Sequence, residues 1–471
     1  MTPTSTRVTP YAASRRADAT PLLVIAGAMA FLAAVLVPVF DSSSRTAFML
    51  LAVLGALGAA AMLAWPHIGV LVILGVWFAE ISPAALGSDF LRIPYVVSAL
   101  LALPLGVAIL RDRDVWVLRD PQIKLLLGIG ALYLLSTAWV EMWNPIEVLP
   151  ELDETRRQLV LFASRLLFVV FFVYFVTTRA RIEAAVALVV ILTALAAFDS
   201  WGTVLTGRFA GRAHAALFDK NPNRLAFVCL FAVSLLWFFV SSPRGRRWAP
   251  LAFPPLLFLP ATALATGSRS GFLQGALLGV LALKGAGSGS ALARVRAFAM
   301  IGVAILVLVA VVPAPLLERA TRFNPDVVAP GQESLNNRML QLRSAGAFAL
   351  GEPIFGIGIG NFEAVSLGRH GIEGGVHNSY VRALVEGGIG VLALYLWLFY
   401  VSYRALARVE RDGPPELRWL ATGTRVGLLL FLLASVTGDI WLNEHLYLVI
   451  AISIVLPRVA QERVVEVRHA A

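Results

Sequence analysis

Long apolar runs recur along almost the whole chain, and they constrain its fold more than any other feature. Each run is roughly 18–22 residues long, the length that an α-helix needs to cross about 30 Å of hydrocarbon. The 471-residue sequence is 58% hydrophobic and only 14% charged, whereas a soluble protein of this size would cover its surface with charge. A closed membrane barrel would show short alternating segments instead. We therefore predict an all-α fold, a polytopic transmembrane bundle of about 12–14 spans.

The predicted spans leave one long polar loop near the C-terminal end. The spans are expected at about 21–40, 46–65, 67–86, 94–110, 123–140, 158–177, 184–203, 225–241, 249–266, 270–284, 297–313, 379–402, 419–437 and 443–457. The resulting division is an N-terminal tail, a first set of helices, a large loop with short helices, a second set of helices and a C-terminal tail: 1–20, 21–313, 314–378, 379–457 and 458–471. Because the first span is too long for the apolar core of a signal peptide, we expect it to remain as an anchor.

Clusters of arginine and lysine occur in alternate connectors between the predicted spans. They are Arg111, Arg113, Arg119 and Lys124; Arg179 and Arg181; Arg244, Arg246 and Arg247; Lys284, Arg294 and Arg296; and Arg404, Arg408, Arg411 and Arg418. Membrane proteins retain such clusters on the cytoplasmic side. The alternation therefore predicts that both termini are cytoplasmic, and the net charge of +10 favours anionic membrane lipids as neighbours.

Several other arginines fall in connectors on the opposite, outer side, where they oppose this orientation signal. These are Arg208 and Arg212, which precede Asn223 between two spans; Arg269, which lies in a tight turn; and Arg338 and Arg343, which lie in the long loop. Guanidinium groups bind phosphate through paired, charge-assisted hydrogen bonds, so an anionic, phosphorylated ligand on the outer side is one interpretation. The alternative is that they extend to lipid headgroups at the interface.

The long loop contains a helical pattern followed by a glycine-rich run. Apolar residues recur at helical spacing from Met339 to Leu350, which predicts an amphipathic helix near the membrane surface. Gly351-Glu352-Pro353 should end that helix. The glycines at 356, 358 and 360 do not follow a strand, and their spacing does not fit a nucleotide-binding loop. We expect them to permit a tight turn or a close backbone approach to another helix.

His377 follows this loop at the start of a predicted span. Its ordinary pKa lies near neutrality, as a general base requires, although a histidine at such a place can also be a cap or an interfacial anchor. Asn378 is a candidate N-cap. Glu386 should face the protein interior, where it could orient His377 or Arg269, or pair with a buried arginine. The remaining candidates, His214, His370 and His445, lack comparable neighbours and are expected at the surface or the interface.

Three patches make the chain resemble the O-antigen ligase and polymerase family of bacterial surface-polysaccharide assembly, over about residues 208–402. The first is Arg338 followed by the run Gly351-Glu352-Pro353-Ile354-Phe355-Gly356-Ile357-Gly358-Ile359-Gly360-Asn361-Phe362. The second is His377-Asn378-Ser379-Tyr380 with Glu386-Gly387-Gly388-Ile389-Gly390. The third consists of Arg212 before Asn221-Pro222-Asn223, and Ser268-Arg269-Ser270-Gly271.

The resemblance implies an integral glycosyltransferase of the bacterial inner membrane. Such an enzyme moves a glycan from undecaprenyl diphosphate to a sugar hydroxyl on the periplasmic face, with inversion and without a metal or cofactor. The catalytic candidates are then His377, Arg269 and Arg212. The substrate-binding candidates are Arg338, Arg343, Asn378, Arg208, Asn223 and Glu386. The acceptor is lipid A-core for a ligase, which we favour, or a second lipid-linked glycan for a polymerase.

Two other classes remain open from the residues alone. A transporter of lipid-linked glycans could also use outer arginines, but it would more often show internal repeats and interrupted spans in corresponding positions. A peptidoglycan glycosyltransferase of the shape-determining type is chemically similar but normally relies on a carboxylate in an outer loop. No basic-aromatic module for nucleic acid is visible, and none is expected in this architecture.

Overall fold

The structure is a computed structural model that describes residues 45–79, 93–112, 115–142, 152–206, 222–287 and 333–470. Within these ranges there are 14 α-helices and no strands. Nine of the helices found there are long and apolar enough to cross a membrane. The all-α, polytopic fold is therefore confirmed. The predicted spans at 21–40 and 297–313 lie outside the described residues.

Most helices agree closely with the predicted spans. The long helices that precede the polar loop are α2 (Arg45–Ala64), α3 (Pro66–Ala79), α5 (Ile93–Asp112), α6 (Pro121–Met142), α7 (Leu152–Phe175), α8 (Arg179–Leu205), α9 (Pro222–Ser241), α10 (Ala249–Ala265) and α11 (Arg269–Gly287). The loop contains α14 (Glu333–Gly351) and α15 (Phe362–His370). The chain then forms α16 (Ser379–Asp412), α17 (Pro415–Thr437) and α18 (Glu444–Ala470), and short 3₁₀ turns cover Trp116–Arg119 and Gly245–Trp248.

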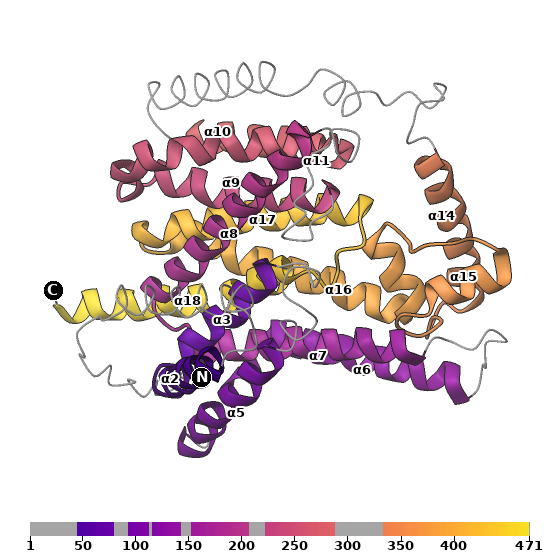
Figure 1. Cartoon of the computed structure of the whole chain (residues 1–471), viewed down its shortest axis with the longest axis horizontal. Helices are drawn as coiled ribbons and strands as arrows, with labels where there is room; N and C mark the ends of the chain where they lie inside the picture. The colour runs from indigo at the N-terminus through magenta and orange to yellow at the C-terminus, as the bar shows by residue number, and fades with distance from the viewer. Residues whose placement is uncertain are drawn as a thin grey trace, which may run out of the picture.

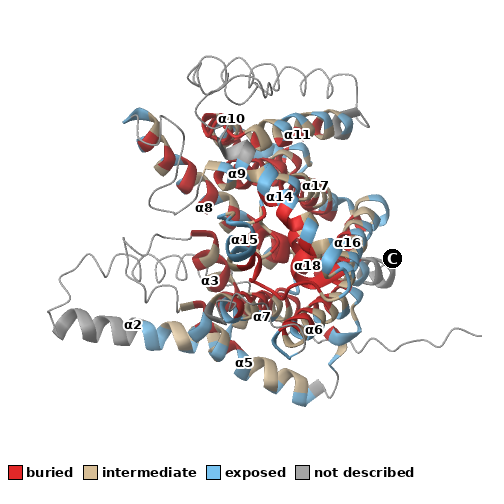
Figure 2. Cartoon of the chain, turned by 90° about the vertical axis from the view of Figure 1, so that its right-hand side faces the viewer, coloured by how far each residue is buried: buried red, intermediate tan, exposed pale blue. Residues whose placement is uncertain are grey.

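The spans form a bundle with α14 and α15 at one end (Figure 1). Helices α6, α7, α9, α16 and α17 run across the picture, whereas α14 stands upright at the right and so lies across their direction. The predicted amphipathic helix is confirmed as α14, which ends at Gly351. Residue burial is greatest where α9, α17 and α18 meet in the middle of the bundle (Figure 2). The polar loop thus packs over one end of a membrane bundle.

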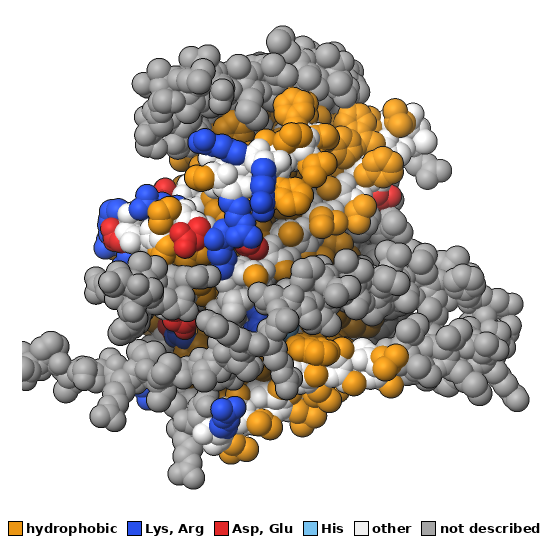
Figure 3. Space-filling view, turned by 90° about the vertical axis from the view of Figure 1, so that its left-hand side faces the viewer, with side chains coloured by type: hydrophobic (Ala, Val, Ile, Leu, Met, Phe, Trp, Pro, Cys, Tyr) orange, Lys and Arg blue, Asp and Glu red, His pale blue; other side chains and the backbone are white. Residues whose placement is uncertain are grey.

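The opposite end carries many basic side chains. The connections α9–α10 and α16–α17 lie at the left of Figure 1. The first contains Arg244 and Arg246 of the predicted clusters, and the end of α16, just before the second, carries Arg408 and Arg411. Viewed from that side, Lys and Arg side chains gather on the surface (Figure 3). The two ends of the bundle therefore differ in charge, and α14 lies at the end away from this basic surface.

Helix α16 is broken at Gly388, whose φ of 73° lies in the left-handed region. The glycine-rich segment fills this break: the Ile389 N–H donates to the Pro353 carbonyl and the Ile357 N–H donates to the Val385 carbonyl, both at 2.9 Å. A Cβ atom at Gly388 would lie 2.0 Å from the Ile354 carbonyl oxygen. The predicted close approach of the glycine run to another helix is confirmed, and its partner is the Glu386-Gly387-Gly388 patch.

A group of charged side chains is buried between α7, α9 and α18. The Glu444 carboxylate is fully buried and accepts two hydrogen bonds from Arg224, at 2.8 and 2.9 Å. The Arg165 guanidinium lies 3.6 Å from the same carboxylate. The expectation that His445 lies at the surface or interface is wrong, because this residue is only 1% exposed. Its ring packs against the rings of Phe78, Phe227 and Phe231. These rings come from α3 and α9, so the sequence next to His445 does not predict this aromatic pocket.

We expect Gly388→Ala to destabilise the protein strongly. At φ 73° and ψ −177° the backbone is in a region essentially restricted to glycine, which costs another residue roughly 1–3 kcal/mol. The alanine Cβ would also collide with the Ile354 carbonyl, which is part of the backbone pairing at the break. Thermal unfolding in detergent should show a clearly lower Tm. The control is Gly279→Ala, at a helical glycine with open space around its Cβ position. Equal Tm values for the two variants would contradict the interlock.

Glu444→Gln should also be severely destabilising. It removes the counter-charge of two partly buried arginines, a loss that costs about 3–5 kcal/mol in buried ion pairs. The control is Glu410→Gln, which breaks a more exposed pair with Arg425 at 2.7 Å and should cost about 1 kcal/mol or less. The comparison is made by chemical denaturation of both variants in the same detergent. A similar midpoint for both would show that the buried carboxylate is not needed for stability.

Candidate functional site

The start of α16 is tied to the turn between α17 and α18. The Asn378 side chain caps the helix, because its Oδ1 accepts from the backbone N–H groups of Tyr380 and Val381 at 3.0 and 3.1 Å. The Ser379 hydroxyl donates to the Gly438 carbonyl at 3.0 Å and accepts from the Ile440 N–H at 2.9 Å. The candidate cap is therefore confirmed, and residues 438–440 are held directly beside His377.

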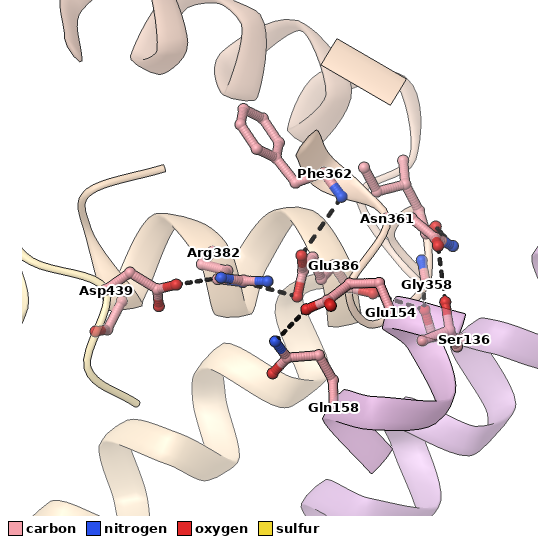
Figure 4. Close-up of polar contacts among 12 residues, drawn as sticks. Ser136, Glu154, Gln158, Gly358, Asn361, Phe362, Arg382, Glu386 and Asp439 are labelled. Carbon is pink, nitrogen blue, oxygen red and sulfur yellow. Dashed lines mark hydrogen bonds and ion pairs between the residues drawn. The ribbon is translucent and has the colours of Figure 1, made fainter. Parts of the chain in front are cut away.

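One turn further along α16, a chain of charges runs into the protein (Figure 4). The buried Arg382 pairs with Asp439 on one side and with Glu386, 3.1 Å away, on the other. The Glu386 Oε1 atom accepts from the Phe362 N–H at 3.4 Å. Since these groups are enclosed by protein, each charge is compensated by a neighbour rather than by water.

The same turn of α16 is also held through its backbone. The Ser136 hydroxyl of α6 donates to the Glu386 carbonyl at 2.7 Å and accepts from the Gly358 N–H at 3.2 Å. Of the two roles weighed for Glu386, pairing with a buried arginine is the one observed. The Glu386 side chain is 0% exposed, so direct contact with a substrate would require it to leave these partners.

Arg269 begins α11 at the same end of the bundle. The next residue, Ser270, accepts a hydrogen bond from the Thr437 hydroxyl at 2.7 Å and another from Gln274 at 2.9 Å. Thr437 is the last residue of α17. The start of α11 is therefore fixed beside the turn 438–440, and Arg269 itself is half-buried.

Arg338 of α14 completes the arrangement. Burial lowers the pKa of this guanidinium, and the positive charge of Arg269 lowers it further. The charge of Arg338 in turn acts on His377, as does the charge of Asp439. Electrostatic interactions therefore connect Arg269 to Arg338, Arg338 to His377, and His377 to Asp439, and we call these four residues the site cluster. They come from four segments that are far apart in the sequence.

Burial lowers the pKa of His377 below its ordinary value, which favours the neutral imidazole. Desolvation by the neighbouring protein is the largest cause of this lower pKa, although His377 is exposed at the surface. The Arg338 charge lowers this pKa further, while Asp439 acts in the opposite direction. A neutral imidazole can accept a proton, whereas the imidazolium cannot. A neutral His377 near Arg338 could therefore take a proton from a hydroxyl, while Arg338 and its neighbour Arg269 hold an anion.

The other predicted residues are distributed around this cluster. Arg343 is exposed on α14, and Asn223 is exposed in the first turn of α9. Arg208 and Arg212 lie outside the described residues, so the geometry brings together only three of the predicted functional arginines and histidines: Arg269, Arg338 and His377. His370 is exposed, as expected, and its Nδ1 lies 2.6 Å from the Ser344 hydroxyl.

Arg382 and Asp439 were missed by the sequence analysis. Two signals point to them. Arg382 lies four residues before Glu386, the spacing at which oppositely charged side chains meet on a helix, and both occur in an apolar span. Asp439 lies in the short turn between two spans, at the outer end. An arginine and a carboxylate that enter a membrane region need a partner nearby.

Comparison with known proteins identifies the segment that carries most of the site. Residues 254–396 match the family model described as O-antigen ligase. This segment is therefore similar to the O-antigen ligases. The resemblance stated above is thereby confirmed. No curated protein matches the chain. The O-antigen ligase segment contains Arg269, Arg338 and His377 but ends before Asp439, so the site cluster is completed by a turn outside the matched residues. The match supports a membrane-bound transferase in O-antigen assembly.

Arg338→Gln should raise the pKa of His377, because it removes a positive charge that disfavours the imidazolium. The matched control is Arg343→Gln, which removes an exposed arginine from the same helix and should leave that pKa unchanged. The pKa can be read from a pH titration of ¹³C-histidine NMR signals in detergent, with the His377 signal assigned by its loss in His377→Asn. An unchanged His377 pKa in Arg338→Gln would separate Arg338 from the site cluster.

Proposed function

We propose that this protein transfers a glycan from undecaprenyl diphosphate to a sugar hydroxyl of lipid A-core, as an O-antigen ligase. The observation that carries the proposal is that His377, whose pKa is lowered by burial, interacts electrostatically with Arg338, which in turn interacts with Arg269, at one end of a membrane bundle. A base and two cations are what this reaction needs, since it generates a proton at the acceptor and negative charge on the leaving group.

In the proposed reaction, a ring nitrogen of His377 takes the proton of the acceptor hydroxyl. The acceptor oxygen forms a bond to the anomeric carbon of the donor as the bond from that carbon to the phosphate oxygen breaks. Undecaprenyl diphosphate leaves with the electron pair of the broken bond. Arg269 and Arg338, together with Arg212, stabilise its charge through hydrogen bonds to the phosphate oxygens. Displacement from the opposite side inverts the anomeric configuration.

Other predicted residues have supporting roles in this proposal. Arg343, Arg208 and Asn223 would contact the diphosphate or the glycan at the edge of the site. Asn378 fixes the start of α16 and thereby the position of His377. Glu386 acts through Arg382 and Asp439. No residue in this scheme requires a metal or a cofactor.

We also propose that the enzyme lies in the bacterial inner membrane with its site cluster at the periplasmic face and both termini in the cytoplasm. Support comes from the charge difference between the two ends of the bundle. Arginine-rich connections occupy the end opposite α14 (Figure 3), and such connections remain in the cytoplasm. The donor and acceptor glycans would then meet the enzyme on the side where α14 and α15 lie.

His377→Ala should insert normally and lose transfer activity by about 10²-fold or more, the usual contribution of a general base. Arg269→Ala should lose about 10²–10³-fold, as expected for an electrostatic contact to a developing anion. The control is His370→Ala, which removes an exposed histidine at the same end of the molecule. Activity is measured with purified protein, undecaprenyl-diphosphate-linked glycan and lipid A-core. Full activity of His377→Ala would remove the proposed base.

Deletion of the gene separates the ligase from its alternatives. Gel analysis of surface glycans should show lipid A-core without long chains, while the lipid-linked polymer still accumulates. A core that carries a single repeat unit would instead indicate a polymerase, which differs in using a second lipid-linked glycan as acceptor. Unchanged lipopolysaccharide with loss of an exopolysaccharide would assign the protein to another polymer. Lipid-linked polymer that stays on the cytoplasmic side would indicate a transporter.

A further inference from the structure

The outward face of α14 and the turn after it is apolar. Leu350 is 85% exposed, Ile354 67% and Met339 53%, and Leu340 and Leu342 are also exposed. Arg343 is the one charged residue among the exposed side chains described in this helix. The inward face of α14, by contrast, is partly polar, since it buries Gln341 and Ser344. A helix whose more apolar face points outward is suited to a lipid environment rather than to water.

The turn after α14 lies beside the candidate span α16, and its depth in the bilayer can be estimated from its position along that helix. The Ile389 N–H of α16 donates to the Pro353 carbonyl, so the turn after α14 touches α16 at residue 389. Ile389 lies 15 residues before Arg404, the first basic residue near the other end of α16. That separation is about 22 Å at 1.5 Å per residue, which is less than the roughly 30 Å of bilayer hydrocarbon.

The surface of α16 at this point is itself lipid-facing. Ile389, Leu396 and Trp397 are 56%, 48% and 55% exposed on a helix long and apolar enough to span a membrane. Leu350 and Ile354 therefore continue the exposed apolar surface of a candidate membrane span. Glu352, the charged residue within this turn, is only half-exposed. Continuity with the span favours lipid as the occupant over a second copy of the chain or another protein.

We infer that residues 350–354, here called the anchor tip, insert into the bilayer at the end of the bundle where His377 lies. Helix α14 then runs along the interface, as its direction across the spans suggests (Figure 1), and Arg343 extends to the lipid headgroups. Arg338 lies on the same helix and acts on His377. The anchor tip thus fixes the height of Arg338 relative to the membrane surface, whatever reaction the site performs.

Single-cysteine labelling tests this inference. The one native cysteine, Cys229, is buried in α9 and can be replaced in a Cys229→Ala background. Leu350→Cys is then labelled with the fluorophore NBD, in full-length protein reconstituted in nanodiscs with or without doxyl-labelled phospholipid. Two matched sites calibrate the signal: Leu396→Cys on the lipid-facing side of α16, and Arg369→Cys on the exposed side of α15. If Leu350→Cys does not give monodisperse protein, Ile354→Cys replaces it.

The expected result is that NBD at residue 350 is quenched by doxyl lipid nearly as well as at residue 396, and is shielded from aqueous iodide. NBD at residue 369 should show the reverse. Quenching of position 350 by iodide and not by lipid would overturn the inference. Shielding of position 350 from both quenchers would also overturn it, because a protein surface rather than the bilayer would then cover the anchor tip.

Discussion

The pairing of the glycine-rich segment with the break in α16 is the contact on which the rest of the site depends. It joins two backbones, Pro353 to Ile389 and Val385 to Ile357, and therefore satisfies polar groups that a helix break leaves open in a membrane environment. Glycine is required because a Cβ atom at Gly356 would lie 2.5 Å from the Val385 carbonyl oxygen. This pairing attaches the loop that carries α14 and α15 to the helix that follows His377.

Charge compensation explains why the interior beneath the site tolerates Arg382 and Glu386. An isolated charge in such surroundings would cost several kcal/mol, but here one arginine bridges two carboxylates, on α16 and on the turn after α17. The interior group around Glu444 uses the reverse arrangement, in which one carboxylate serves two arginines. Both groups link helices that are distant in sequence, so each adds specificity as well as compensation.

The sequence allowed the fold class and much of the site to be predicted, for identifiable physical reasons. Span length and charge asymmetry follow from bilayer thickness and insertion, so α6, α9 and α17 appear close to where they were expected. Arg269 stood out because it opposes the orientation signal, and His377 because its ordinary pKa suits a general base. Asp439 did not stand out, since its importance arises from a pairing with Arg382, 57 residues away. His445 was misplaced because its aromatic neighbours come from α3 and α9.

The long-range hydrogen bonds have a consequence for how the protein is made. Ser136 of α6 bonds to the Glu386 carbonyl, 250 residues later, and Ser379 bonds to a turn that exists only after α17 has ended. Early spans must therefore be synthesised before these polar contacts can form, because their partners come much later in the chain. Asp439 lies in the turn after α17, so the site cluster is complete only after this turn has been synthesised.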